Sequence, residues 1–233
     1  MAKLINTDHF PGQVRICDDV ATEYTKIVIE HIRDCLTDSD PNAKPISDLA
    51  FAISGGSSGK VCLETLLASK STLLEQVEWL LVDERCVDKT HPDSNYNMIS
   101  SIIKQNGLPE NHLYDLDCDN EGYYEEILLS KKLEIIQLGF GPDGHCASLF
   151  PNSQALNTDP QQLIAKNIDP SGKNRHPRIT MTLAAIAKFR LALICIIGEE
   201  KREAVHQISE GQTLPAAMVK ANNVIWLIDK RAI

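Results

Sequence analysis

The 233-residue sequence contains no C-x-x-C pair and no long apolar run. Its cysteines stand singly, which excludes a zinc ribbon and a thioredoxin-type redox pair, and their odd number, seven, favours reduced thiols in the cytosol. The longest apolar run, Leu191 to Ile197, is far shorter than the ~18 residues of a membrane span, and the N-terminus has no apolar signal segment. We therefore expect a cytoplasmic protein with no membrane partner.

Basic residues are also scarce, since 23 Lys and Arg stand against 32 Asp and Glu and give a net charge of −9. This balance argues against a nucleic-acid partner and requires any anionic ligand to find locally placed positive charge. A hydrophobic content of 43% with 24% charged residues is ordinary for a globular protein and excludes wholesale disorder. From the length we expect residues 1–233 to form a single α/β domain.

Short apolar strands alternate with amphipathic helices along the chain. Apolar residues recur at helical spacing from about Ile16 to Leu36, and a first buried strand is expected from Leu49 to Ser54. Further strands are expected at 77–82, 133–138, 179–182, 191–197 and 224–228, and helices at 61–68, 94–104, 121–129 and 199–209. This order predicts a doubly wound, mainly parallel sheet with helices on both faces. Residues 152–176 have no clear period and form either a surface excursion or a short extra strand.

Three polar or glycine-rich loops each follow a predicted strand. They are Ser54 to Lys60, Asp83 to Arg85, and Gly139 to His145. The carboxyl ends of parallel strands lie along one edge of a sheet, where ligands of open α/β sheets bind. We therefore expect the three loops to share one site.

The first loop can bind an anion, because Gly55 and Gly56 allow backbone N–H groups to turn inward ahead of a helix N-terminus. A tight turn without a ligand is the alternative for this loop taken alone. The loop is no Walker P-loop, since its glycines enclose three residues instead of four and Val61 replaces the magnesium-binding Ser or Thr.

Two other motif matches are weaker. Residues 55–59 fit G-x-S-x-G, and Ser57, Asp83 and His145 follow the chain order of an α/β-hydrolase triad, which would make a serine esterase. Against this, the loop follows the first predicted strand, and no upstream oxyanion motif is present. Residues 139–144 fit a dinucleotide fingerprint, but Asp143 would repel a pyrophosphate and Pro151 leaves room for only a short helix.

His145 is the candidate acid–base group, because imidazole exchanges protons near neutral pH and its glycine-rich loop lets a substrate approach closely. Arg85 follows two acids and fits a structural ion pair, a phosphate-clasping fork, or both. No zinc-ligand spacing accompanies His91, so no metal is expected. Cys86 and Cys146 have no activating partner of their own and are interpreted as bystanders.

Taken together, the motifs resemble the 6-phosphogluconolactonase family, within a superfamily that includes glucosamine-6-phosphate deaminase and ribose-5-phosphate isomerase. The resemblance covers residues 10–229, and its most specific part is the pair D-E-R and G-x-G-P-D-G-H-x-A-S-L-F-P. Its segments are S-G-G-S at 54–57, V-D-E-R at 82–85 with H-P-D-S-N-Y-N at 91–97, the stretch 139–151, R-I-T-M-T-L at 178–183, G-E-E-K at 198–201 and L-P-A-A at 214–217. The sequence departs from the family pattern at Ser58-Gly59, at Cys146 and at Met218, where an Arg is usual.

The resemblance implies hydrolysis of 6-phospho-D-glucono-1,5-lactone in the oxidative pentose phosphate pathway, on a deaminase/isomerase-type fold, without metal or organic cofactor. It implies a general base at His145 with Asp143 in the same loop. The implied substrate-binding residues are Gly55, Gly56, Ser57, Asp83, Arg85, Arg178 and Lys201. We expect a monomer or weak oligomer whose partner is a small phosphosugar lactone. A sugar-phosphate deaminase or isomerase, and a noncatalytic sugar-phosphate sensor, are the alternatives on this scaffold.

Overall fold

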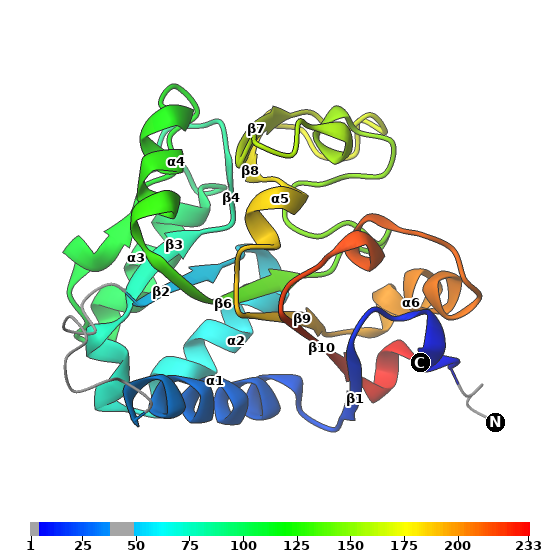
Figure 1. Ribbon diagram of the computed structural model, residues 1–233, viewed down its shortest axis with the longest axis horizontal. Helices are drawn as coiled ribbons and strands as arrows, with labels where there is room; N and C mark the ends of the chain where they lie inside the picture. The colour runs from blue at the N-terminus through cyan, green and yellow to red at the C-terminus, as the bar shows by residue number, and fades with distance from the viewer. Residues whose placement is uncertain (1–4, 38–48) are drawn as a thin grey trace.

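The computed structural model describes residues 5–37 and 49–233, and two β-sheets lie within these ranges (Figure 1). The large sheet is parallel, in the order β1-β10-β9-β6-β2-β3-β5. Its strands are β1 (Gln13–Cys17), β2 (Leu49–Ile53), β3 (Glu78–Leu81), β5 (Leu113–Tyr114), β6 (Lys132–Gly139), β9 (Leu191–Ile196) and β10 (Asn223–Asp229). The small sheet is antiparallel, in the order β4-β8-β7, with β4 (Asp83–Arg85), β8 (Arg178–Met181) and β7 (Ile164–Asn167).

Helices cover both faces of the large sheet. They are α1 (Val20–Thr37), α2 (Gly56–Ala68), α3 (Asn95–Gln105), α4 (Glu121–Ser130), α5 (Leu183–Ile186) and α6 (Arg202–Ser209). Successive strands advance one way from β1 to β5 and the other way from β6 to β10, so right-handed crossovers put α1–α3 on one face and α4–α6 on the other. Figure 1 shows α1 and α2 below the sheet and α4 and α5 above it. The doubly wound fold predicted from the sequence is thereby confirmed.

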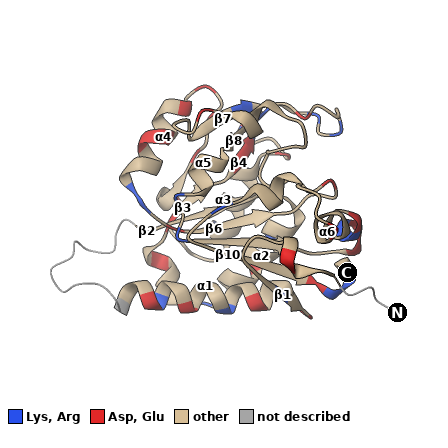
Figure 2. Ribbon diagram, turned by 45° about the vertical axis from the view of Figure 1, so that its right-hand side comes forward, with Lys and Arg blue, Asp and Glu red and all other residues tan. Residues whose placement is uncertain are grey.

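Seven short 3₁₀ helices complete the described elements. They are η1 (Thr7–His9), η2 (Thr72–Gln76), η3 (Glu110–His112), η4 (Gln154–Asn157), η5 (Glu199–Lys201), η6 (Pro215–Met218) and η7 (Lys230–Ala232). Among the helices within the described ranges, none is both long enough and apolar enough to cross a bilayer. Lys and Arg alternate with Asp and Glu along α1 instead of gathering on it (Figure 2).

The core lies between the large sheet and its helices. Every residue of β2 and of β9 is buried, which explains why these strands read as continuous apolar runs. Phe51 on β2 stacks on Trp79 of β3, with ring centroids 5.2 Å apart.

The N-terminal part of the sequence prediction is wrong in one respect. Ile16 lies in β1, which pairs with β10, and the helix begins at Val20. The Asp19 carboxylate accepts hydrogen bonds from the first amides of that helix, from Ala21 at 3.0 Å and from Thr22 at 3.1 Å. Because β1 is an edge strand that buries only Cys17, it carries little apolar signal, and β2 was mistaken for the first strand.

The antiparallel sheet was not predicted. Residues 179–182, expected as a strand, largely belong to β8, but their partners β4 and β7 are only 3 and 4 residues long. Strands this short show no readable alternation. The segment 152–176 contains η4 and β7, so the extra-strand alternative is confirmed there.

The expectation of reduced thiols is also wrong at two positions. Cys86 and Cys118 form a disulfide across a sequence separation of 32 residues, with their Cα atoms 5.6 Å apart. The pairing depends on the end of β4 meeting the loop after β5, which single cysteine positions do not reveal. The other five cysteines are free and buried.

Candidate active site

The site lies where the strand order of the large sheet reverses, between β2 and β6. The loops that leave these two strands diverge to opposite faces and open a crevice, which is the usual ligand position in doubly wound sheets. The crevice holds a cavity of about 160 Å³. Its lining includes residues from the three predicted loops and also from β8 and η5.

The structure brings the predicted site residues together. Eight of the nine line this cavity, namely Gly55, Gly56, Ser57, Asp83, Arg85, His145, Arg178 and Lys201. The ninth, Asp143, does not line the cavity but is hydrogen-bonded to His145. The segments after β2, β3 and β6 therefore share one site, as the strand pattern predicted, although the second of them, Asp83–Arg85, is the strand β4 and not a loop.

The glycine loop leaves the N-terminus of α2 open. Gly56, the first residue of α2, has φ +75°, which favours glycine, and the N-cap residue Gly55 provides no side-chain hydrogen bond. A Cβ on Gly55 would collide with the side-chain amide of Asn95. The first amides of α2 are therefore available to an anion at the positive end of the helix dipole.

The N-terminus of α3, in contrast, is capped by the protein itself. The Glu84 carboxylate accepts hydrogen bonds from the amides of Asn95 and Tyr96, each at 2.7 Å. Ser94 adds a side-chain cap by accepting from the amide of Asn97 at 3.1 Å. Burial raises the pKa of Glu84, although these hydrogen bonds oppose the rise. The capping role of Glu84 was not predicted, because nothing in the sequence links an acid at position 84 to the start of a helix at position 95.

The alternation of β4 sorts the D-E-R residues onto two sides. Asp83 and Arg85 face the cavity, whereas Glu84 points to α3. The buried Asp83 carboxylate accepts a hydrogen bond from the Ser148 hydroxyl at 2.6 Å. It is thus fixed at the cavity wall as an acceptor.

A serine-esterase triad is not assembled here. Asp83 is engaged by Ser148, and His145 by Asp143, so the predicted order Ser57, Asp83, His145 does not form a relay. The positive φ at this turn belongs to Gly56 and not to Ser57, unlike the strained serine of a nucleophile elbow.

Two arginines lie opposite each other on neighbouring strands of the small sheet. Arg85 and Arg178 are register partners of β4 and β8, and both line the cavity. Burial lowers the pKa of Arg178, and the positive charge of Arg85 lowers it further. Each guanidinium donates to a backbone carbonyl, Arg178 to His176 at 2.8 Å and Arg85 to Asp93.

Carboxylates leave this arginine pair largely unneutralised. Within the described ranges, neither guanidinium has a carboxylate oxygen closer than 4.0 Å. Lys201 adds a third, buried cation at the cavity, 3.5 Å from Glu200. The arrangement favours a dianionic group such as a phosphate.

His145 is held by its own loop. Its Nδ1 lies 2.5 Å from Asp143 Oδ1, and its ring packs edge-on against Phe150, with centroids 5.0 Å apart. Partial burial would raise the pKa of Asp143, but the hydrogen bond and charge of His145 outweigh it and lower that pKa. The ionised carboxylate fixes the proton on Nδ1 and leaves Nε2 as the nitrogen that accepts a proton.

Several residues that line the cavity were not predicted from the sequence. Asn95, Ser148 and Phe150 line the cavity within segments that carried the family resemblance, so their motif membership was the available signal. Asn174 comes from the segment without a clear period, where its backbone and side-chain N–H groups donate to Asp169 at 3.0 and 2.8 Å. Only the folded loop places it at the site.

Cys146 directly follows His145 but is no candidate nucleophile. Complete burial raises the pKa of its thiol to about 12, with a smaller contribution from Asp83. Such a thiol stays protonated at neutral pH, in agreement with its interpretation as a bystander.

The L-P-A-A segment contributes no cavity lining among the described residues. It forms η6, and the amide of Ala216 donates to the carbonyl of Gly144 at 3.0 Å. The segment therefore supports the backbone of the loop that carries His145. Met218, where an Arg is usual in the family pattern, does not line the cavity.

One group of side chains in the described part of the chain has metal-ligand spacing, namely His31, Cys35 and Glu134. It lies at the start of β6, at the opposite edge of the sheet from the cavity. Burial would raise the pKa of Glu134, but hydrogen bonds from His31 and Lys132 outweigh it and lower that pKa to about 2. Lys132 Nζ is 2.9 Å from Glu134, so the group reads as a neutralised buried carboxylate.

Comparisons with known proteins identify relatives of this chain. A family model described as "Glucosamine-6-phosphate isomerases/6-phosphogluconolactonase" matches residues 17–226. A 6-phosphogluconolactonase of Synechocystis is 30% identical over 203 residues, 78% of this chain and 82% of that protein. One from Haemophilus influenzae is 30% identical over 204 residues, 78% of this chain and 85% of that protein.

Solved structures share the fold. The 6-phosphogluconolactonase of Thermotoga maritima gives a TM-score of 0.79 at 24% identity and covers 94% of this chain and 99% of that one. A monomeric glucosamine-6-phosphate deaminase gives a TM-score of 0.72 at 18% identity and covers 94% of this chain and 98% of that one. With the family model matching most of its length, this chain belongs to the glucosamine-6-phosphate isomerase/6-phosphogluconolactonase family.

Proposed function

We propose that this protein hydrolyses 6-phospho-D-glucono-1,5-lactone to 6-phosphogluconate, a step of the oxidative pentose phosphate pathway. The observation that carries the proposal is the shared cavity, which is lined by a carboxylate-bound histidine and by two arginines that form no ion pair with a carboxylate of the described residues. A substrate with an activated ester at one end and a phosphate at the other uses both features. The curated relatives named 6-phosphogluconolactonase support the same assignment.

The cations hold the phosphate. A sugar phosphate is largely dianionic at neutral pH, and it offsets the repulsion between Arg85 and Arg178. The uncapped amides of α2 and the buried Lys201 supply further donors. Asp83 accepts hydrogen bonds from sugar hydroxyls, because its carboxylate is fixed at the cavity wall by Ser148.

His145 then activates water. Its Nε2 removes a proton from a water molecule as the water oxygen attacks C1 of the lactone, and the carbonyl becomes an oxyanion. When the bond between C1 and the ring oxygen breaks, the same proton passes from His145 to the departing oxygen. Asp143 positions the ring and stabilises the imidazolium.

The proposal is tested by proton release at constant pH with freshly prepared 6-phosphogluconolactone, corrected for spontaneous hydrolysis. We expect rapid release with this substrate and little with unphosphorylated gluconolactone, because the latter lacks the anion that the arginines bind. Equal acceleration of both lactones would contradict the phosphate site.

Two control reactions separate the alternatives. Ammonia release from glucosamine 6-phosphate, with no lactone hydrolysis, would replace the proposal by a deaminase. Covalent labelling of Ser57 by a fluorophosphonate with loss of activity would favour a serine esterase.

We also propose that residues 1–233 fold as one domain that acts in the cytoplasm as a monomer or weak oligomer. Light scattering coupled to gel filtration measures the mass directly. A stable dimer or larger species at micromolar concentration would contradict the oligomeric part of this proposal.

A further inference from the structure

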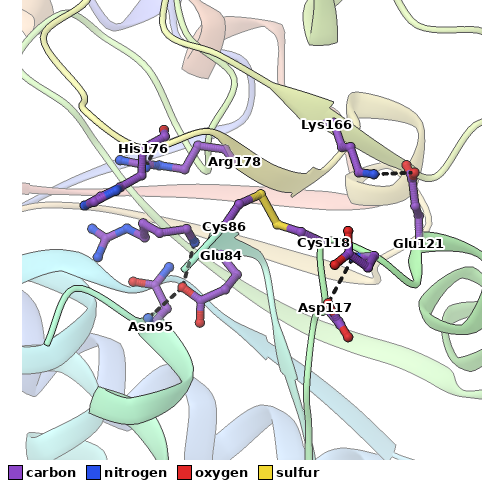
Figure 3. The surroundings of a disulfide bond; sticks show 11 residues. Glu84, Cys86, Asn95, Asp117, Cys118, Glu121, Lys166, His176 and Arg178 are labelled. Carbon is purple, nitrogen blue, oxygen red and sulfur yellow. Dashed lines mark hydrogen bonds and ion pairs between the residues drawn. A yellow bond between two sulfur atoms is a disulfide. The ribbon is translucent and has the colours of Figure 1, made fainter. Parts of the chain in front are cut away.

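The Cys86–Cys118 disulfide begins at the residue after Arg85, and Arg178 lies on the adjoining strand (Figure 3). Cys86 follows Arg85 at the end of β4, in the small sheet. Its partner Cys118 lies in the loop between β5 and α4, and β5 pairs with β3 of the large sheet. The disulfide therefore ties the end of an arginine-bearing strand to a segment anchored in the other sheet.

Each arginine is adjacent in the chain to a residue of one backbone hydrogen bond, which joins Cys86 to Pro177. The amide of Cys86 donates to the carbonyl of Pro177 at 2.9 Å, and Pro177 immediately precedes Arg178. Figure 3 shows Cys86 and Arg178 on adjoining strands, with the disulfide running from Cys86 away from the Arg178 side chain. A shift of the Cys86 backbone is thus transmitted to both β4 and β8.

The disulfide is open to a reductant. Cys86 and Cys118 are both only partly buried, unlike the free cysteines, and they line a second cavity of about 530 Å³. This cavity adjoins the substrate cavity, since Arg85 lines both.

We propose that the Cys86–Cys118 disulfide is a redox-sensitive positioning device for Arg85 and Arg178, and that its reduction by a dithiol weakens binding of the substrate's phosphate. The inference rests on the proposed function for the identity of the substrate. The two cysteines touch no reacting atom and act through the arginines.

A dithiol reduces the disulfide in two exchange steps. One thiolate of the dithiol attacks a protein sulfur, breaks the S–S bond and forms a mixed disulfide. Its second thiolate then attacks the reductant's sulfur in that mixed disulfide and releases the protein thiolate. Two electrons pass to the protein, both of its sulfurs end as thiols after protonation, and the dithiol leaves as a cyclic disulfide.

Reduction is expected to act on KM and not on kcat. The His145–Asp143 pair belongs to the loop after β6, and its interactions are within that loop and with Phe150. The Arg85 guanidinium, by contrast, is oriented by the Asp93 carbonyl in the loop that leaves Cys86. Removing the cross-link relaxes the backbone of this loop while the proton-transfer pair stays in place.

The experiment compares the full chain in its oxidised form and after anaerobic treatment with dithiothreitol, with lactone hydrolysis as the readout. Mass spectrometry after thiol alkylation confirms that two thiols appear on reduction. We expect KM to rise about fivefold or more, at the low end of couplings between sites, with kcat little changed. Oxidation should restore the original KM.

Matched variants separate the disulfide from general thiol effects. Cys86→Ser and Cys118→Ser should each show the raised KM without reductant and no further response to it. Cys17→Ser, at a free buried thiol in β1, should keep the full redox response. If the disulfide variants fold poorly, reduction of the unmodified chain tests the inference by itself.

Several results would overturn the inference. These are an unchanged KM despite proven reduction, a loss of kcat alone, or the absence of the disulfide from protein purified without reductant. If neither form hydrolyses the lactone, the proposed function fails separately. Titration with inorganic phosphate then decides, since a weaker Kd in the reduced form supports the positioning device and equal Kd values reject it.

Discussion

The two sheets contribute different things to one cavity. The large parallel sheet supplies the His145–Asp143 pair and the open helix N-terminus, at the ends of β6 and β2. The small antiparallel sheet supplies Asp83 and the two arginines. Under the proposed function, proton transfer depends on the large sheet alone, whereas the anion site of the large sheet is completed by the two arginines of the small one. Substitutions in the large sheet's loop should therefore change kcat, and those in the small sheet should change KM.

The sharpest test of this division is His145→Ala. General-base assistance accounts for about 10²–10⁴-fold in rate, so we expect kcat to fall by that range with KM nearly unchanged. Steady-state kinetics on the phosphorylated lactone measure both constants. Asp143→Asn should cause a smaller fall in kcat, because it leaves the imidazole in place but loses its orientation. An unchanged kcat for His145→Ala would remove this residue from the mechanism.

Glu134, at the end of the large sheet opposite the cavity, should affect stability and not activity. The pKa of Glu134 is lowered from an ordinary 4.5 to about 2, so its stabilising contribution is present above pH 4.5 and is lost as the pH falls toward 2. Because its partner Lys132 is exposed to solvent, which screens the pair, the shift corresponds to at most roughly 3 kcal/mol of unfolding free energy at neutral pH.

Urea unfolding of Glu134→Gln measures this contribution. The variant should be less stable than the unmodified chain at pH 7, and the difference should shrink between pH 4.5 and 2. Its kcat and KM should stay unchanged. A difference that persists in full at pH 2 would mean that the carboxylate charge is not responsible.

On the small sheet, Arg178→Ala should raise KM by about 10- to 100-fold, as expected when a charge-assisted hydrogen bond is lost, with a smaller effect on kcat. Arg178→Lys should recover only part of the affinity, because an ammonium lacks the planar fork of the guanidinium. The exposed Arg175 offers a matched control, and Arg175→Ala should leave KM unchanged. A pure loss of kcat in Arg178→Ala would place the arginine at the carbonyl and break the division between the sheets.

The smallest effect is expected at Glu84, which faces α3 and not the cavity. Glu84→Gln keeps one acceptor oxygen but loses the charge at the helix N-terminus, so we expect a loss of about 1 kcal/mol in unfolding free energy. Thermal unfolding and KM are measured on the same preparation. A large rise in KM with unchanged stability would show that Glu84 belongs to the binding site.

The sequence predicted those parts of the site that depend on local order. The loops after β2 and β6 follow buried apolar strands, so the position of Gly55, Gly56 and His145 at one edge could be inferred before the structure was known. Arg178 and Lys201 entered only through the family resemblance. Arg178 begins β8 of the small sheet, and Lys201, although it follows β9, falls within the helix predicted at 199–209.

The rest depended on contacts between distant segments. The edge strand β1 and the three-residue strand β4 have too few buried residues to show a period. The disulfide, the capping of α3 by Glu84 and the entry of Asn174 into the cavity each join elements that only folding brings together.

The alternation along β4 has a consequence for how variants of this tripeptide would reveal themselves. Neighbouring side chains point to opposite sides, so substitutions at position 84 affect the stability of the fold, whereas substitutions at positions 83 and 85 affect ligand binding. Substitutions at 84 should appear in an expression screen as a reduced yield of intact protein. Those at 83 and 85 should give normal yields of protein that turns over substrate poorly.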